Sequence, residues 1–288
     1  MSKIAVVTGA TSGIGRSLVL TLLKDDMTVI GVGRSDDKIN QLISDAKDYY
    51  DDKKLFIVKG DLSYHKALEV LSQSIIDILV ENEFKIDYLC HVAGRVTSGY
   101  HISQDHHELT FQVNHLAVVD LTYFLLPYMV ESLESRILVV SSQSHFRANI
   151  NFNDLETKTY YTILRSYKRS KLYNVLFVKA FSKKYNEIPI YAIDPALVRT
   201  NIGMKNTSKL ASFVWHMRSK KGVHPAVPAK HMLDVIKDQS FNDLSGSYIK
   251  HGKPITSNPL TYQDDVVERL WKVSLDMLEI TDYFHKKS

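Results

Sequence analysis

The chain has 288 residues, 44% hydrophobic and 24% charged, which favours one large α/β domain over two smaller ones. Its formal net charge of +4 is mild for this length and does not indicate a nucleic-acid-binding protein. The single cysteine, Cys90, excludes an internal disulfide and is typical of a reducing compartment, so we expect a cytoplasmic, intracellular protein. We find no stretch of about 20 apolar residues of the kind that spans a bilayer.

The first two-thirds of the chain alternate β-branched runs with amphipathic segments, the pattern of βαβ units and a parallel sheet. We expect strands at Ile4–Thr8, Thr28–Val32, Lys54–Val58, Ile86–His91, Arg136–Ser141 and Ile188–Ile193. Helical spacing of apolar residues predicts helices at Ile14–Lys24, Asp36–Tyr49, His65–Glu81, Gln104–Leu133 and Tyr161–Tyr185. After Pro195 the rhythm changes, and only a short strand around Ser247–Ile249 and a last helix from Gln263 to about Glu279 are predicted.

These elements predict an α/β fold of the doubly wound Rossmann type. It forms a single domain over residues 1–288, with a mainly parallel sheet of about seven strands flanked by helices.

A glycine-rich segment, Thr8–Gly15, lies between the first strand and the first helix. Gly9, Gly13 and Gly15 have no side chains, so backbone amides can approach a pyrophosphate at the helix N-terminus, where the helix dipole favours negative charge. The alternative is a tight strand–helix turn without a ligand. The other residues of this loop that we expect to bind the cofactor are Thr11, Ser12 and Ile14.

The end of the second strand bears on the choice of dinucleotide. An acidic residue there binds the ribose 2′-hydroxyl of NAD, whereas an arginine accommodates the 2′-phosphate of NADP. Arg34 and Ser35 occupy this place and can both donate to a phosphate, so we expect NADP(H) to be preferred over NAD(H). Asp36 and Asp37 follow, which leaves NAD open as the alternative.

Tyr167 and Lys171 are the candidate proton-transfer pair. They lie four residues apart in a predicted helix and therefore share one face. A lysine charge favours the phenolate, which allows a tyrosine to serve as a general acid or base near neutral pH. The spacing also occurs at Tyr49/Lys53, Tyr50/Lys54 and Tyr283/Lys287, so only the context of each copy distinguishes them.

In this context the chain resembles the short-chain dehydrogenase/reductase family over almost its whole length. Thr8–Gly15 is similar to the family's glycine motif, and the sequence carries further family motifs in the expected order. These are Asp61-Leu62 after the third strand, Ala93-Gly94 after the fourth, Val113-Asn114 in the following helix, Ser141-Ser142 after the fifth strand, Tyr167 to Lys171, and Pro195-Ala196-Leu197-Val198-Arg199-Thr200. Two positions depart from the family pattern, with Val92 in place of an asparagine and Ala196 in place of a glycine.

The resemblance implies hydride transfer between a nicotinamide cofactor and an alcohol or carbonyl carbon, the chemistry of a dehydrogenase or carbonyl reductase. It implies Tyr167 as general acid or base, and Lys171 as the group that lowers its pKa and binds the nicotinamide ribose. Ser142 would bond the developing oxyanion, and Asn114 would hold a water that links Lys171 to solvent. It further implies that Asp61, Leu62, Ala93, Gly94, Pro195, Val198 and Thr200 contact the cofactor. Taken singly, each catalytic candidate also has a purely structural interpretation.

Gly246-Ser247-Tyr248 and Leu270–Ser274 resemble the retinol dehydrogenase and WW-domain oxidoreductase branch. The segment at about 197–228 would then cover a small-molecule carbonyl or alcohol substrate. Family analogy also suggests a homodimer through Gln104–Leu133 and Tyr161–Tyr185. The alternatives are a cofactor-binding regulator with little or no turnover, and a lipid-surface protein that uses Leu210–Met217.

The histidines receive separate interpretations. His145 is interpreted either as part of the substrate mouth or as plain surface. His101, His106 and His107 are interpreted as solvated positions rather than metal ligands, because no carboxylate or cysteine lies at a metal-binding spacing.

Overall fold

Eight strands form a single sheet in the order β3-β2-β1-β4-β5-β6-β7-β8. The structure is a computed structural model that describes residues 2–198 and 222–284. All neighbouring strands run parallel except β7 and β8, which pair antiparallel. The strands are β1 Ile4–Thr8, β2 Thr28–Gly33, β3 Leu55–Lys59, β4 Tyr88–His91, β5 Arg136–Val140, β6 Ile190–Asp194, β7 Tyr248–Lys250 and β8 Lys253–Ile255.

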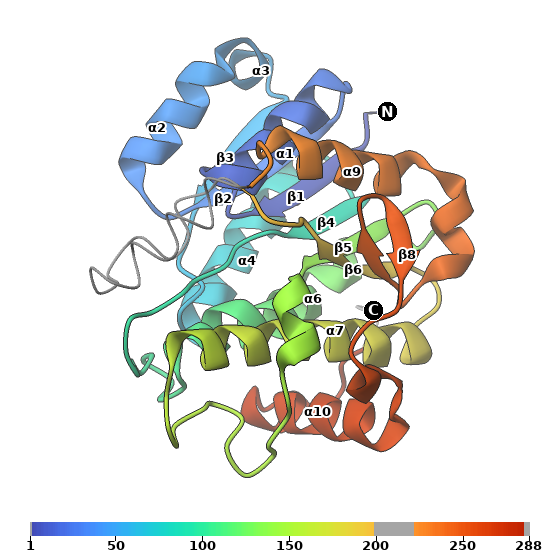
Figure 1. Ribbon diagram of the computed structural model, residues 1–288. Helices are drawn as coiled ribbons and strands as arrows, with labels where there is room; N and C mark the ends of the chain where they lie inside the picture. The colour runs from blue at the N-terminus through green and yellow to red at the C-terminus, as the bar shows by residue number, and fades with distance from the viewer. Residues whose placement is uncertain (1, 199–221, 285–288) are drawn as a thin grey trace.

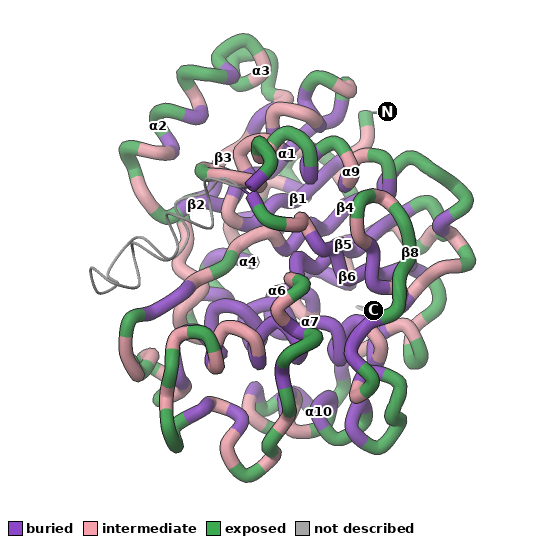
Figure 2. Tube along the Cα trace, in the orientation of Figure 1, coloured by how far each residue is buried: buried purple, intermediate pink, exposed green. Residues whose placement is uncertain are grey.

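Helices cover both faces of the sheet, as the doubly wound prediction requires (Figure 1). One face packs against α1 Gly13–Lys24 and α9 Ala226–Lys237, with α2 Asp36–Asp45 beside β2. The opposite face packs against α4 His65–Glu81, α6 Ala117–Leu125 and α7 Ile163–Lys184, and α10 Asp264–Met277 packs on α7. Figure 2 shows the buried residues concentrated in the central strands and the helix faces turned toward them. The predicted fold class is therefore confirmed.

Two predicted helices have different limits in the structure. Asp36–Tyr49 is divided at Ala46 into α2 and the short α3 Lys47–Asp51. The helix predicted at Gln104–Leu133 is shorter in the structure. It begins with α5 Leu109–Phe111 and continues through a π-helical turn at Gln112–Leu116 into α6. It ends in a 3-10 turn at Leu126–Tyr128. Its start is set by Glu108, whose carboxylate accepts hydrogen bonds from the backbone N–H groups of Thr110 and Phe111.

The prediction missed α9 and β8. Helix α9 lies beyond the irregular segment after Pro195, and its first residue directly follows Pro225. Its helical spacing of apolar residues therefore does not stand out from that segment in the sequence. Strand β8 has three exposed residues, Lys253, Pro254 and Ile255, at the sheet edge. A short, exposed edge strand that contains proline shows no alternation of apolar and polar residues. The sheet consequently has eight strands rather than about seven.

Helix α7 is covered by the chain itself. Trp271 of α10 stacks on Phe177 of α7, with ring centroids 5.7 Å apart and planes inclined by 7°. Tyr283 closes over the same face and donates a hydrogen bond to the Val119 carbonyl oxygen of α6 at 2.7 Å. Part of the surface of α7 is therefore covered within the chain, and the homodimer through these two helices stays a prediction.

The run Leu109–Tyr128 is, within the described residues, long and apolar enough to cross a membrane, contrary to our reading of the sequence. Because 83% of its most apolar window is buried inside the protein, it serves here as a core helix.

Candidate active site

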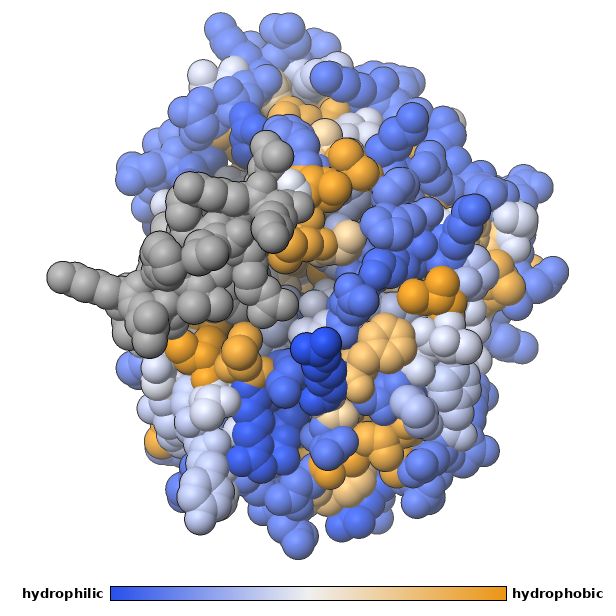
Figure 3. Space-filling view, in the orientation of Figure 1, coloured by the Kyte–Doolittle hydropathy of each residue, from blue (hydrophilic) through white to orange (hydrophobic). Residues whose placement is uncertain are grey.

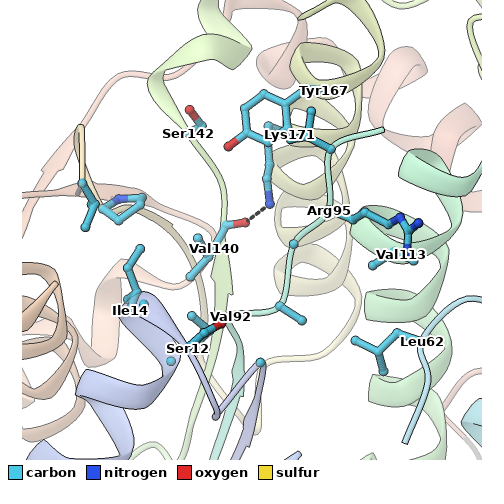
Figure 4. A pocket seen from close by; sticks show the side chains of 18 of the residues that line it. Ser12, Ile14, Leu62, Val92, Arg95, Val113, Val140, Ser142, Tyr167 and Lys171 are labelled. Atoms are coloured by element: carbon cyan, nitrogen blue, oxygen red, sulfur yellow. Dashed lines mark hydrogen bonds between the residues drawn. The ribbon is translucent and has the colours of Figure 1, made fainter. Parts of the chain in front are cut away.

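A cleft of about 1670 Å³ opens along the carboxyl ends of the parallel strands. The strand order reverses between β1 and β4, and parallel α/β sheets bind ligands beside such a switch point. Single-ligand pockets are typically about 300–1,000 Å³, so this cleft has room for a dinucleotide together with a second molecule. Figure 4 shows part of its wall, with residues from the first helix, from the ends of β4 and β5, and from α7.

Nearly all of the predicted site residues line this one cleft. They are Gly9, Thr11, Ser12, Gly13, Ile14, Gly15, Arg34, Ser35, Asp61, Leu62, Ala93, Gly94, Ser142, Tyr167, Lys171, Pro195 and Val198. Asn114 is the exception among the described residues, since it is fully buried behind the wall. Thr200 and Leu210–Met217 lie outside the described residues.

The glycine loop forms a close-packed cradle at one end of the cleft. A Cβ on Gly15 would overlap the Gly9 carbonyl oxygen, and a Cβ on Gly9 would stand only 2.9 Å from the Ala93 Cα. Gly9 and Gly13 have φ angles of +69° and +54°, a region that side chains disfavour. Among the described residues, the Ser12 hydroxyl does not cap α1. The first residues of the helix line the cleft, and the residues present fit the pyrophosphate of a dinucleotide.

Tyr167, Lys171 and Ser142 meet at the middle of the cleft (Figure 4). The Lys171 ammonium group lies 5.8 Å from the centre of the Tyr167 ring and donates to the Val140 carbonyl oxygen at 2.9 Å. Burial lowers the pKa of Lys171 to about 8 from its usual 10.5. Ser142 begins a 3-10 turn, and its hydroxyl accepts from the Ser144 N–H at 3.2 Å. A phenol, an ammonium and a hydroxyl therefore border the same space.

Asn114 takes a position that sequence reasoning did not anticipate. Its side-chain oxygen accepts from the Arg95 N–H at 2.7 Å, and its side-chain N–H₂ donates to the Arg95 carbonyl oxygen and to the Ser170 hydroxyl, both at 3.0 Å. The amide thus ties the loop after β4 to helix α7. It lies within the π-helical turn, where the backbone hydrogen-bond pattern is interrupted.

Three cations line the cleft near the end of β2, which lies against Thr11 of the glycine loop. They are Arg34, Lys38 and Arg95. The sequence analysis missed Arg95, although this residue directly follows the Ala93-Gly94 motif. Desolvation and the positive charge of Arg34 lower the pKa of Arg95, while Asp61 opposes that effect. Arg34, Arg95 and Asp61 thus line the same cleft, and the two arginines repel each other.

The two departures from the family pattern have distinct structural consequences. At Val92 the backbone is held by Thr8, whose hydroxyl oxygen accepts from the N–H groups of Val92 and Ala93 at 3.1 and 3.2 Å. These bonds tie the ends of β1 and β4 together. Ala196 has φ +61°, so a residue with a Cβ occupies a left-handed conformation there.

His145 does not line the substrate mouth, and it is not a surface residue either. It is fully buried, with Nδ1 2.7 Å from the Ser142 carbonyl oxygen and Nε2 accepting from the Asn258 N–H at 3.2 Å. An Nε2 that accepts from a backbone N–H places the proton on Nδ1, and burial lowers the pKa of this imidazole. His145 therefore supports, from behind, the 3-10 turn that Ser142 begins, which we call the serine turn.

The surroundings of Cys90 and of the histidines bear on their reactivity. Cys90 is buried in β4, and burial raises the pKa of its thiol to about 12, which suppresses the reactive thiolate. Residues 2–198 and 222–284 contain no group of three histidine, cysteine, aspartate or glutamate side chains placed to bind a metal ion. His107 instead lies 3.2 Å from Glu156.

A phosphate cradle beside a buried lysine and a phenol defines a nucleotide-dependent oxidoreductase with alcohol and carbonyl chemistry. Residues 3–211 match the model of the short chain dehydrogenase family. The chain belongs to that family, and it is an NAD(P)-dependent enzyme acting on CH–OH or C=O groups.

The chain is similar to several retinol dehydrogenases. Retinol dehydrogenase 12 from Bos taurus is 29% identical over 280 residues, which cover 96% of this chain and 87% of the relative. Retinol dehydrogenase 13 from Homo sapiens is 28% identical over 283 residues, which cover 94% of this chain and 83% of the relative. The predicted resemblance to retinol dehydrogenases is therefore confirmed.

Solved structures share the fold at lower sequence identity. The NADPH-bound carbonyl reductase from chicken fatty liver is 20% identical, with a TM-score of 0.64 over 89% of this chain and 99% of that chain. A protein from Mycobacterium paratuberculosis has a TM-score of 0.69 and 20% identity over 98% of this chain and 94% of that chain.

Proposed function

We propose that this protein is an NADP-dependent oxidoreductase that interconverts an aldehyde or ketone with an alcohol, with Tyr167 as general acid and base. The observation that carries the proposal is the meeting of Tyr167, Lys171 and Ser142 in the cleft that also contains the glycine cradle. When bound, the cofactor supplies or accepts the hydride. The protein supplies the proton and the geometry.

Tyr167 holds the proton that moves. In the reducing direction its hydroxyl donates a proton to the carbonyl oxygen, and in the oxidising direction it accepts the alcohol proton. Ser142 donates a hydrogen bond to the same oxygen, after its hydroxyl hydrogen turns into the cleft, and stabilises the negative charge that develops there.

Lys171 supplies the nearby positive charge, which favours the phenolate of Tyr167. The Val140 carbonyl oxygen holds the ammonium group in place, so little reorganisation is needed during the reaction.

We further propose that NADP(H) is preferred because of the cations at the end of β2. Arg34 and Lys38 line the cleft beside Ser35, and Arg95 approaches from the loop after β4. A 2′-phosphate dianion relieves the repulsion between Arg34 and Arg95, whereas the hydroxyl of NAD does not. NADP-bound relatives of the same fold, such as the angucycline ketoreductase LanV, are consistent with this preference.

The substrate is expected to be apolar. Exposed apolar side chains stand at the mouth of the cleft, with Ile102 58%, Leu164 46% and Phe146 38% exposed. Figure 3 shows apolar residues gathered around the hollowed middle of this face. A retinoid-type alcohol or aldehyde fits such a mouth, and it is also what the names of the retinol dehydrogenase relatives suggest.

The decisive experiment compares the wild type with Tyr167→Phe on a panel of aldehydes, ketones, retinoids and steroids, followed by NADPH absorbance. We expect the wild type to turn over at least one apolar carbonyl. Tyr167→Phe should fold and bind NADPH, but its kcat should fall by roughly 10²–10⁴-fold because the proton donor is lost. Near-wild-type turnover in this variant would sink the mechanism. NADPH binding without turnover by the wild type would favour the alternative, a cofactor-binding regulator.

The same exposed apolar mouth favours a second candidate role, contact with a lipid surface from which an apolar substrate is drawn. Sedimentation with liposomes of neutral and anionic composition tests it. Co-sedimentation that Leu164→Ser and Phe146→Ser reduce would support the role. A wild type that stays in the supernatant with both compositions would eliminate it.

A further inference from the structure

We infer that Asp194 and Tyr248 form a clamp that substitutes for the missing glycine at position 196 and so positions the loop against the cofactor. The positioning role rests on the proposed function, in which Pro195 and Val198 lie along the cofactor. Asp194 is the last residue of β6, and Tyr248 is the first residue of the neighbouring strand β7.

The clamp is built from two hydrogen bonds to one carboxylate. Asp194 Oδ1 accepts from the Ala196 N–H at 2.8 Å, and Asp194 Oδ2 accepts from the Tyr248 hydroxyl at 2.7 Å. The Asp194 side chain is 1% exposed, and the Lys250 ammonium group lies 3.8 Å from its Oδ2. A buried carboxylate without partners is costly, so each bond holds its donor firmly in place.

Ala196 needs this support because of its conformation. At φ +61° its Cβ crowds the backbone, an arrangement that glycine tolerates freely and alanine resists by roughly tenfold or more in population. The bond from the Ala196 N–H to Asp194 holds the Pro195–Ala196 peptide in place. Because this peptide is held, fewer conformations are lost when Ala196 enters the left-handed turn, which a glycine adopts without help.

Tyr248 connects the clamp to the serine turn. Its ring lies against His145, with centroids 4.5 Å apart, and His145 Nδ1 contacts the Ser142 carbonyl oxygen at 2.7 Å. Burial and the charge of Asp194 raise the pKa of the Tyr248 hydroxyl far above its usual value, so it remains a donor throughout the working pH range. One tyrosine therefore supports both loops that border the proposed reaction centre, without touching a reacting atom.

The test compares Tyr248→Phe, Asp194→Ala, Ala196→Gly and the double variant Asp194→Ala/Ala196→Gly. Tyr248→Phe keeps the ring on His145 and removes only the hydroxyl. We expect it to raise the NADPH dissociation constant by about tenfold, as loss of a hydrogen bond to a charged group predicts, while the pH profile of kcat keeps its shape. Asp194→Ala should weaken NADPH binding further. Adding Ala196→Gly should recover about fivefold to tenfold, because glycine adopts the turn unaided.

The matched control is Tyr191→Phe. Tyr191 is a fully buried tyrosine of the same strand, β6, whose hydroxyl bonds the Phe241 carbonyl oxygen away from the loop. It should lower the unfolding midpoint without changing the NADPH dissociation constant. A Tyr248→Phe variant that binds NADPH like the wild type, or a double variant no better than Asp194→Ala, would overturn the inference.

Two results, an unfolded Asp194→Ala variant and a wild type that does not bind NADPH, require further measurements. If Asp194→Ala does not fold, Asp194→Asn replaces it with similar volume and without the charge. If the wild type binds no NADPH, the proposed function fails. The clamp is then tested by the urea unfolding free energies of the apoprotein, in which Ala196→Gly should offset the loss caused by the Asp194 variant but not that caused by Tyr191→Phe.

Discussion

Lys171 holds its ammonium group 5.8 Å from the centre of the Tyr167 ring while remaining only 2% exposed. The ammonium group donates a hydrogen bond to the neutral carbonyl oxygen of Val140. Burial consequently lowers the pKa of Lys171 to about 8, from an ordinary 10.5. Lys171, next to the proposed proton donor Tyr167, is therefore expected to titrate near working pH.

The depressed pKa of Lys171 predicts a pH-dependent stability of the apoprotein. Between pH 8 and 10.5 the unfolded chain holds a proton on this lysine that the folded protein has released, so the folding stability rises with pH across that window. From pH 8 to 9.5 the gain should be about 2 kcal/mol. Lys171→Met should lack it, as measured by urea unfolding at several pH values. Lys168→Met, on the same helix but only partly buried, is the control. Parallel pH dependence in the wild type and Lys171→Met would contradict this prediction.

Arg34→Ala should change the choice of cofactor. Removing this guanidinium should raise the NADPH Michaelis constant by about tenfold or more, as loss of a charge-assisted bond predicts, while the NADH constant changes little. Steady-state kinetics with both cofactors measure the ratio. Arg147→Ala, which removes an arginine that lines the same cleft beside Phe146, should leave the NADPH-to-NADH ratio unchanged. An unaltered NADPH constant in Arg34→Ala would show that the phosphate is bound elsewhere.

Gly15→Ala should abolish cofactor binding. The new methyl group would overlap the Gly9 carbonyl oxygen, and the cradle must open to accommodate it. Gly99→Ala is the matched control, because its Cβ would meet only His101 Nε2 at 3.6 Å, an ordinary contact. Fluorescence titration with NADPH should show no saturation for the first variant and near-wild-type affinity for the second. Tight binding by Gly15→Ala would argue against the cradle.

Trp271→Ala should destabilise the fold by about 3–5 kcal/mol, the cost of deleting a large buried aromatic side chain. Trp271 packs against Phe177 and Tyr283, with ring centroids 5.7 and 4.8 Å away, and these contacts cover α7. Urea unfolding measures the loss, with the exposed Lys272→Ala as control.

Because α10 and Tyr283 cover part of α7, we expect a monomer, and sedimentation equilibrium should find a species near 32.9 kDa. A stable dimer in the wild type would contradict this expectation.

Much of the fold was predictable from local pattern. Strand β1 and helix α4 have the predicted limits, since a continuous apolar run and a regular helical face are signals carried by neighbouring residues. The glycine loop was likewise predictable, because its function depends on missing side chains at fixed spacing. Strand β8 was not, since its three residues are exposed and paired only at an edge.

Among the copies of Tyr-x-x-x-Lys, tertiary position separates the candidate pair from the others. Tyr167 and Lys171 line the cleft, whereas Tyr49 and Tyr50 lie on α3, outside its lining, and Lys287 lies beyond the described residues. Burial of Lys171, and with it the pKa of about 8, comes from packing of α7 against β5 and cannot be read from the spacing.

The sequence by itself determined the doubly wound architecture, the phosphate loop and the order of the proposed site residues, because each depends on residues close together in the chain. Only the tertiary structure decided which distant groups meet. It placed Arg95 beside Arg34, buried His145 behind Ser142, and brought Tyr248 of β7 to the carboxylate of Asp194. Such contacts depend on strand pairing across long stretches of chain, and no local pattern of residues encodes which side chains will share a buried space.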